Sequence, residues 1–162
     1  MAEATYDIAE YVVDIAKKEG LAEGLEALPG GVALHLACHA RAQNMGAKAA
    51  EMLRLVPDAD LTVIDRCSGH GGSWGVMKAH FETALKLGRP AARQVANSGQ
   101  RFIASECPLA GLHLLEGIER QDIERQDIEL QDIELQDGEN KPETDTAYHP
   151  IELFARAYGY EN

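Results

Sequence analysis

The sequence is poor in cysteine, in aromatic residues and in long hydrophobic runs. Its 162 residues include three cysteines, one tryptophan and only 6% aromatic residues. Because the number of cysteines is odd and they lie far apart, we expect a reducing, cytoplasmic setting and not a disulfide framework. No stretch approaches about eighteen consecutive apolar residues, so we expect no transmembrane helix. The N-terminus, MAEATYDIAE, lacks the apolar core of a secretory signal.

Basic residues are also scarce relative to acidic ones. The chain has 15 Lys and Arg against 27 Asp and Glu, which gives a formal net charge of −12. Nucleic-acid binding requires basic patches that neutralise phosphate, so we expect no nucleic-acid partner. Residues 117–141 hold nine acidic and three basic residues, a net −6, which is half of the total. Because the acidity is so concentrated, it says little about which partner the rest of the chain binds.

Hydrophobic residues make up 45% of the chain, enough for one domain with a core. Apolar residues at helical spacing predict a first helix over residues 5–19. Three β-rich runs follow and predict strands at Val32–Ala37, Leu61–Asp65 and Arg101–Ser105.

Helical patterns separate and follow these strands. They cover 46–57, then 76–88 and 90–99 as two stretches that each end at glycine, then 108–117 and 149–159. Pro108 and Pro150 stand at the expected first positions of the last two helices. Strands that alternate with helices predict an α/β fold with a parallel sheet and right-handed crossovers, while an α+β domain with mixed strands is the alternative.

One segment, residues 117–141, is a tandem five-residue repeat that reads GIERQ, DIERQ, DIELQ, DIELQ, DGENK. Each five-residue step turns a helix by roughly 140°, so the repeated isoleucines do not share one helical face. We therefore expect a solvated low-complexity insertion, although the composition also allows it to prolong the preceding helix. The predicted organisation is a lead-in helix and loop at 1–29, a core at 30–119, the repeat insertion at 120–142 and a helix that completes the core at 143–162.

The three cysteines fall at the predicted ends of the strands. Cys38 ends the first strand, Cys67 lies two residues past the second, and Cys107 directly follows the third. The carboxyl ends of parallel strands lie along one edge, where ligand crevices form. Helix N-termini nearby favour thiolates, which are the ligands that select zinc and iron–sulfur clusters. The positions predict one shared site, and the alternative is three small buried hydrophobic residues.

A histidine is the best candidate for a further ligand. His70 lies in the loop CSGHGGSWG, whose glycines allow close approach to a ligand and let the loop turn back toward the thiolates. His39 is second, while we expect packing or surface roles for His35, His80 and His113. Alternatively, Cys107 and His70 form a nucleophile–base pair, for which no orienting acid is identifiable.

Three segments resemble the cysteine-rich CCG domain that occurs in the B subunit of heterodisulfide reductase and in the C subunit of anaerobic glycerol-3-phosphate dehydrogenase. LACHARAQNMG matches the first element through Cys38, and RCSGHGGSWG matches the Cys-Cys-Gly element with Cys67 and Ser68. ECPLAG matches the Cys-x-x-Cys element with Cys107 and Ala110, and the closing HPIELFARAYG resembles the tail of such proteins. Three of the five motif cysteines are thus present.

The resemblance implies a Rossmann-like, three-layer α/β domain that serves electron transfer without catalysing substrate oxidation itself. An iron–sulfur cluster, of the 4Fe–4S class, would be held by Cys38, Cys67 and Cys107, with His70, Ser68 or an external group completing it. The implied partners are dehydrogenase or reductase subunits, in the cytoplasm, with any attachment to the inner membrane made through those subunits. The alternatives are a structural zinc site of Cys₃His type and a metal-free docking module whose cysteines are relics.

Overall fold

The computed structural model describes residues 5–44, 46–126 and 146–160, without the side chains of 121–126. The strands are β1 (Val32–His35), β2 (Leu61–Ile64), β3 (Phe102–Ser105) and β4 (Ala147–Tyr148). They form one sheet in the order β2-β1-β3-β4, and every neighbouring pair is parallel. The α/β fold with a small parallel sheet is therefore confirmed. The strands β1, β2 and β3 are each one or two residues shorter than the ranges that the sequence predicted.

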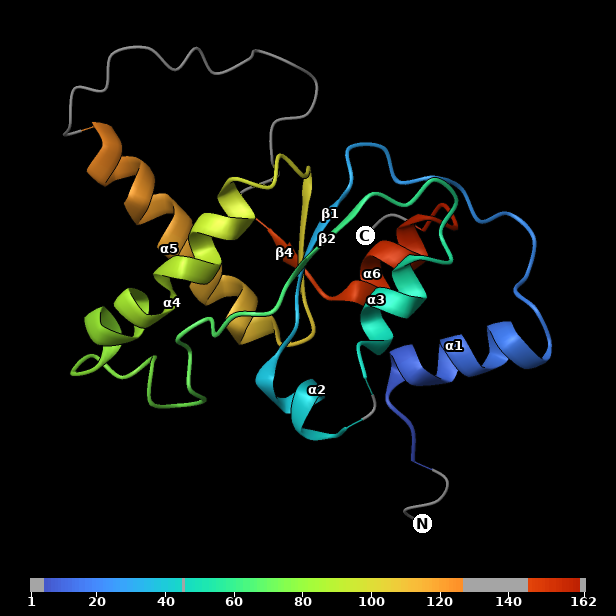
Figure 1. The fold of residues 1–162 in the computed structure, drawn as a ribbon, viewed down its shortest axis with the longest axis horizontal. Coiled ribbons are helices and arrows are strands. Elements are labelled where there is room, and N and C mark those ends of the chain that lie inside the picture. Colours follow the sequence, from blue (N-terminus) through green and yellow to red (C-terminus); the bar gives the residue numbers. More distant parts are fainter. Residues whose placement is uncertain (1–4, 45, 127–145, 161–162) are drawn as a thin grey trace.

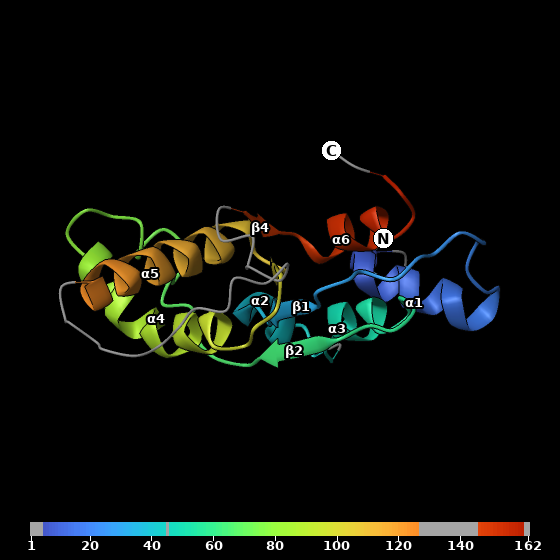
Figure 2. The ribbon, with the colours of Figure 1, turned by 90° about the horizontal axis from the view of Figure 1, so that it is seen from above.

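Helices cover both faces of the sheet and make three layers (Figures 1 and 2). One face carries α1 (Ile8–Lys18), α3 (Lys48–Leu53) and α6 (Pro150–Arg156), and the other carries α4 (Phe81–Ala96) and α5 (Pro108–Gln126). The short helix α2 (Cys38–Ala42) lies at the end of β1. None of these helices, within the described ranges, is long and apolar enough to span a membrane.

The core is divided into two parts by the alternation of side chains along the strands. Leu34 and Phe102 point into the cluster that contains α1, α3 and α6. Ala33 and Ile103 point into the cluster that contains α4 and α5. Neighbours on a strand face opposite sides, so a strand buried on both faces needs an uninterrupted apolar run. All four residues of β1 and of β3 are accordingly buried, whereas three of the four residues of the edge strand β2 are half-buried.

The starts of α1 and α6 follow from side-chain caps, and those of α5 and α6 from prolines. The side chain of Asp7 accepts a hydrogen bond of 2.8 Å from the N–H of Ala9 and caps α1. His149 caps α6, in a reciprocal arrangement with Glu152, and Pro150 occupies the first position of that helix. Pro108 likewise opens α5. The expected helix starts at the two prolines are confirmed.

The prediction of two helices at 76–88 and 90–99 is wrong, because α4 runs unbroken from Phe81 to Ala96 through Gly88 and Pro90. A proline inside a helix costs about 3 kcal/mol or more. The helix continues because a buried stripe on both sides of Pro90 packs on the sheet, on α5 and on the loop after Cys67: Ala84, Leu85, Gly88, Ala91, Ala92 and Val95. Tertiary burial outweighs the local breaking signal.

The repeat begins as part of the core. Helix α5 continues to Gln126, so the repeat prolongs the preceding helix. Ile118 is only 4% exposed, and Gly117 packs beside Ala92 of α4. Arg120 forms an ion pair with Glu82 of α4 at 2.7 Å. The expectation of a solvated insertion is therefore wrong for the first unit. Residues 127–145, which hold most of the repeat, lie outside the described residues. The predicted boundary between the core and the insertion, at residues 119 and 120, falls inside α5 and stays a prediction.

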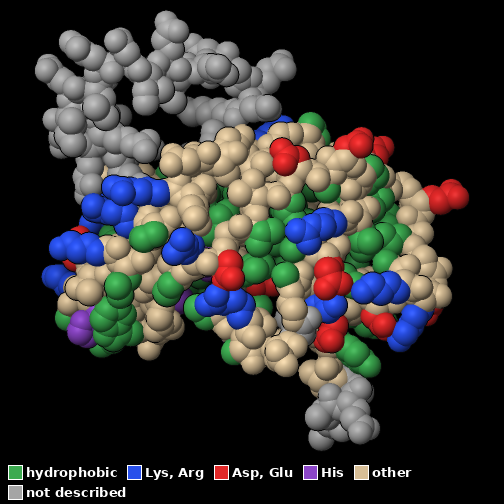
Figure 3. Space-filling model, in the orientation of Figure 1, with side chains coloured by type: hydrophobic (Ala, Val, Ile, Leu, Met, Phe, Trp, Pro, Cys, Tyr) green, Lys and Arg blue, Asp and Glu red, His purple; other side chains and the backbone are tan. Residues whose placement is uncertain are grey.

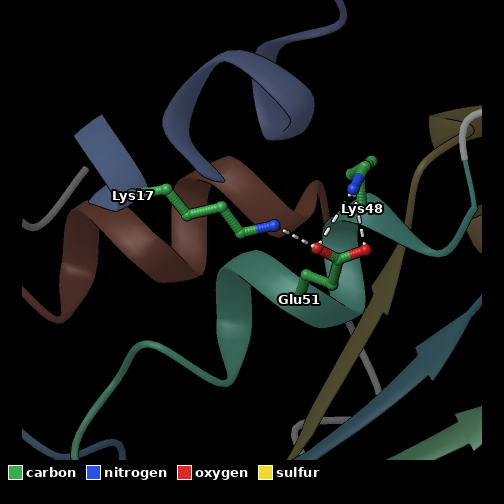
Figure 4. A network of polar contacts seen from close by, with 3 residues as sticks. All are labelled: Lys17, Lys48 and Glu51. Carbon is green, nitrogen blue, oxygen red and sulfur yellow. Dashed lines mark hydrogen bonds and ion pairs between the residues drawn. The ribbon is translucent and has the colours of Figure 1, made fainter. Parts of the chain in front are cut away.

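Helix α1 packs into the same core as α3 and α6. Its residues Ala9 and Val13 are buried there. Glu51 of α3 binds Lys48 at 2.8 Å and 3.0 Å and Lys17 of α1 at 3.3 Å (Figure 4). Exposed ion pairs of this kind contribute about 0–1 kcal/mol. The apolar contacts therefore hold α1 in place, and the ion pairs add little to them.

Charge is unevenly distributed over the surface. Residues 66–105, which include α4, contain six basic residues and one acidic residue, a net +5 within a chain of −12. On the face drawn in Figure 3, blue basic side chains gather toward the end that carries α4, whereas red and blue alternate over the opposite end. The segment from residue 66 to residue 105 is therefore locally basic, although the chain as a whole is acidic.

Candidate functional site

The three loops that carry the cysteines leave the sheet at the same edge. The last residues of β1, β2 and β3 are in register with one another, and β1 lies between the other two. Cys38 and Cys67 each follow the end of their strand by three residues, and Cys107 follows by two. Residues far apart in the sequence are thus brought to the carboxyl edge, as the sequence predicted for a parallel sheet.

All three cysteines are free thiols, and two of them are exposed. Cys38 is the first residue of α2 and not the end of a strand. Cys38 and Cys67 are exposed, while Cys107 is half-buried. The guanidinium of Arg41 lies 3.9 Å from Cys38 Sγ, and the N–H of Gly69 donates to Cys67 Sγ at 3.3 Å. The alternative of three buried hydrophobic cysteines is therefore wrong for Cys38 and Cys67.

His35 ties the ends of the three strands together below the cysteines. Its ring is 1% exposed, and Nε2 donates to the carbonyl oxygen of Arg66 at 3.0 Å. Its Nδ1 lies 3.0 Å from Ser105 Oγ, which also accepts the N–H of Cys107 at 3.3 Å. Burial lowers the pKa of His35, so the ring is neutral at pH 7. The expected packing role is confirmed, but nothing in the sequence showed that it links the loops of Cys67 and Cys107.

A crevice of about 230 Å³ opens at the same edge. It lies at the ends of β1 and β3, where the strand order reverses and ligand crevices commonly form. Its walls are Leu36, Ala40, Arg41, Asn44, Gly46, Ala47 and Glu106. Glu106 accepts the N–H of Ala37 at 3.0 Å, and burial raises the pKa of this carboxyl group. Sequence reasoning missed Glu106, although it directly precedes Cys107.

His70 is placed differently from what the sequence suggested. It is 6% exposed, and its ring centre lies 6.1 Å from that of His113 on α5. The loop that carries it is packed tightly on α4, because a Cβ on Gly69 would come within 2.0 Å of the carbonyl oxygen of Ala84. The expectation of a flexible loop that is free to turn toward the thiolates is therefore wrong at this point. Gly69 instead allows the loop to pack closely against α4.

The donor chemistry of this edge suits a metal that prefers sulfur, since it gathers the loops of three free thiols. Within the described residues, however, no three His, Cys, Asp or Glu side chains lie close enough to hold a metal ion. The fold thus assembles the loops but not a closed set of ligands. The ligand set of Cys38, Cys67, Cys107 and His70 stays a prediction.

Sequence comparison shows similarity to one kind of protein. No family model and no solved structure matches the chain. The chain is 33% identical over 90 residues to the C subunit of anaerobic glycerol-3-phosphate dehydrogenase from Escherichia coli K12, and equally to that from Escherichia coli O157:H7. The match covers 55% of this chain and 23% of each relative. This chain is related in sequence to those dehydrogenase subunits, while the finer match to a CCG domain stays a prediction.

Proposed function

We propose that this chain is an electron-transfer module of an anaerobic-type dehydrogenase or of a heterodisulfide-reductase-like complex. Two observations support the proposal. The first, which carries it, is that three free cysteines follow three neighbouring parallel strands at one edge. The second is the sequence similarity to a subunit of an anaerobic dehydrogenase.

Cys38, Cys67 and Cys107 would hold an iron–sulfur cluster, which supplies one-electron acceptance and donation when bound. His70 is the proposed fourth ligand, and Ser68 or an external group is the alternative. Hydrogen bonds to cysteine sulfur tune the potential of such a centre. The Gly69 N–H already donates to Cys67 Sγ, and Arg41 donates to Cys38 Sγ.

A partner subunit would cover this edge. Four apolar side chains near the cysteine loops are each more than half exposed: Val76 and Met77 after Cys67, and Leu109 and Leu112 after Cys107. Contiguous exposed apolar residues are typical of interaction surfaces, and we propose that these four side chains belong to one. The proposed partners are the dehydrogenase or reductase subunits, which would also determine any association of this cytoplasmic module with the inner membrane.

The proposal is tested by purifying the full chain without oxygen and measuring iron, acid-labile sulfide and zinc. We expect iron and sulfide, and a loss of most of both in Cys38→Ser, Cys67→Ser and Cys107→Ser. Zinc without sulfide would support a structural Cys₃His site. If the purified chain carries neither iron nor zinc, and the three serine variants bind partners as the parent does, the result supports a docking module and overturns the proposal.

The fourth ligand is tested with His70→Ala and the exposed His39→Ala as a matched control. Loss of one ligand should lower metal affinity by about 10-fold or more, while His39→Ala should change it little. Circular dichroism of both variants checks that the fold is retained. Metal binding by His70→Ala that equals the parent would transfer the assignment to Ser68 or to an external group.

A further inference from the structure

Two buried imidazole nitrogens lie between the glycine-rich loop and α5 without partners. His70 and His113 are 6% and 5% exposed. Among the described residues, neither His70 Nδ1 nor His113 Nε2 has a hydrogen-bond partner. Buried polar atoms in native proteins are nearly always bonded to protein, water or an ion. Two such atoms on adjacent rings therefore call for a bound species that pairs with both, and a metal ion that accepts nitrogen lone pairs would do so.

Both histidines are positioned against the same residue of α4, Ala84. His113 is hydrogen-bonded to the carbonyl oxygen of Ala84, and because its Nε2 has no partner, Nδ1 is the donor. This bond fixes the tautomer in which Nε2 carries the lone pair, which is the usual support for a metal-binding histidine. Gly69, next to His70, packs against the same carbonyl oxygen. Phe81 packs against the His113 ring at 5.7 Å and limits its movement.

The ring separation suits one ion between the two histidines. With metal–nitrogen bonds of about 2.0–2.1 Å, each ring centre lies about 3.2 Å from the metal. Two rings on one ion are then about 6.4 Å apart in a linear arrangement and about 5.2 Å apart in a tetrahedral one. The observed 6.1 Å lies between these values and nearer to the linear one.

We propose that His70 Nδ1 and His113 Nε2 together bind one late first-row transition-metal ion. Imidazole suits copper and zinc. The near-linear separation favours Cu⁺, whereas Zn²⁺ would draw the rings together and take two further donors. The inference goes beyond the proposed function because it requires none of the three thiolates, and it adds His113, for which the sequence suggested a packing or surface role. With His70 Nδ1 assigned to the ion that it shares with His113, the thiolate site is completed by Ser68 or an external group, the alternatives named above.

The test uses the full chain with Cys38, Cys67 and Cys107 all replaced by serine, so that a thiolate site cannot contribute. Zn²⁺ and, without oxygen, Cu⁺ are titrated in competition with a chromogenic chelator. We expect one ion per chain, with affinity about 10-fold lower or more in His70→Phe and in His113→Phe. The exposed His39→Phe is the matched control and should bind as the parent does.

X-ray absorption of the metal-loaded triple variant supplies a second readout that needs no histidine substitution. Scattering from two imidazoles is expected. Failure of the triple variant to bind either ion, equal affinity in His113→Phe, or a spectrum without imidazole scattering each overturns the pair. Because the triple variant has no cysteines, these outcomes do not depend on the thiolate site. The proposed function is tested separately, by the iron and sulfide content of the parent chain.

Discussion

Gly69 lies against the carbonyl oxygen of Ala84, so closely that a Cβ at position 69 would come within 2.0 Å of it. The contact seats the loop after Cys67 on α4 and brings His70 beside His113. The reciprocal approach, of Gly88 of α4 to the carbonyl oxygen of Ser68, is as close, since a Cβ at position 88 would come within 2.1 Å of that oxygen. Two glycines thus decide where the loop lies.

Gly69→Ala should destabilise the protein by about 3 kcal/mol or more, because the new Cβ meets backbone atoms that cannot move aside. Its φ of +80° adds a strain of about 1–2 kcal/mol for a residue with a Cβ. Gly72→Ala is the matched control, since Gly72 has a φ of +64° with nothing within 4 Å and should show the strain alone. Urea unfolding measures both. Equal losses in the two variants would contradict the packing role of Gly69.

His35→Ala should cost about 2–4 kcal/mol, because it removes two buried hydrogen bonds and leaves a cavity between the strand ends. Ser105 Oγ and the Arg66 carbonyl would lose their partner. The exposed His39→Ala, by contrast, should stay within about 0.5 kcal/mol of the parent. Thermal unfolding gives the comparison. We also expect faster alkylation of Cys107 in His35→Ala, since Ser105 helps to position its backbone.

Stability should fall as the pH drops below about 6.5, the ordinary pKa of histidine. Burial lowers the pKa of His35 and of His113, so the unfolded chain binds protons that the folded chain does not. Their contribution is therefore complete above the unfolded pKa and is lost as the pH falls toward the folded pKa. Unfolding free energies measured between about pH 8 and about pH 5 test this. The half-buried carboxyl group of Glu106, whose raised pKa acts on stability in the opposite direction, is common to the parent and the variant below. His35→Gln should flatten the slope, and an unchanged slope would count against it.

Ile118→Ala should cost about 2–4 kcal/mol, as expected for a large apolar residue that is removed from a core. Ile118 is packed in the cluster between the sheet and helices α4 and α5. Ile128→Ala, two repeat units further on, changes the same residue type in the same sequence context. From the pattern of the repeat we predict that it shifts the melting temperature only slightly. Similar losses of stability in the two variants would contradict the prediction that only the start of the repeat packs in the core.

Local sequence patterns were sufficient for the elements of the fold. Short, largely apolar runs bounded by turn residues marked β1, β2 and β3, because buried strands need a nearly continuous hydrophobic run. Pro108 and Pro150 marked the starts of α5 and α6, since proline loses no helical hydrogen bond in the first turn. The cysteines could be assigned to one edge because parallel strands all end on the same side.

The tertiary structure decided what depends on contacts between distant residues. Pro90 and Gly88 signal a break, but α4 continues because a buried stripe on both sides of Pro90 packs across it. Ile118 looks like any other isoleucine of the repeat, and only its place above Ala92 and the sheet buries it. His70 reads as a residue of a flexible loop, but Gly69 and Ala84 direct it to His113. The sequence by itself determined the elements, because these follow from short-range periodicity. It also determined the edge at which the cysteines stand, because strands that alternate with helices run parallel and end on one side. The direction of each side chain at that edge follows from close packing between segments far apart in the chain, and short-range patterns carry no information about it.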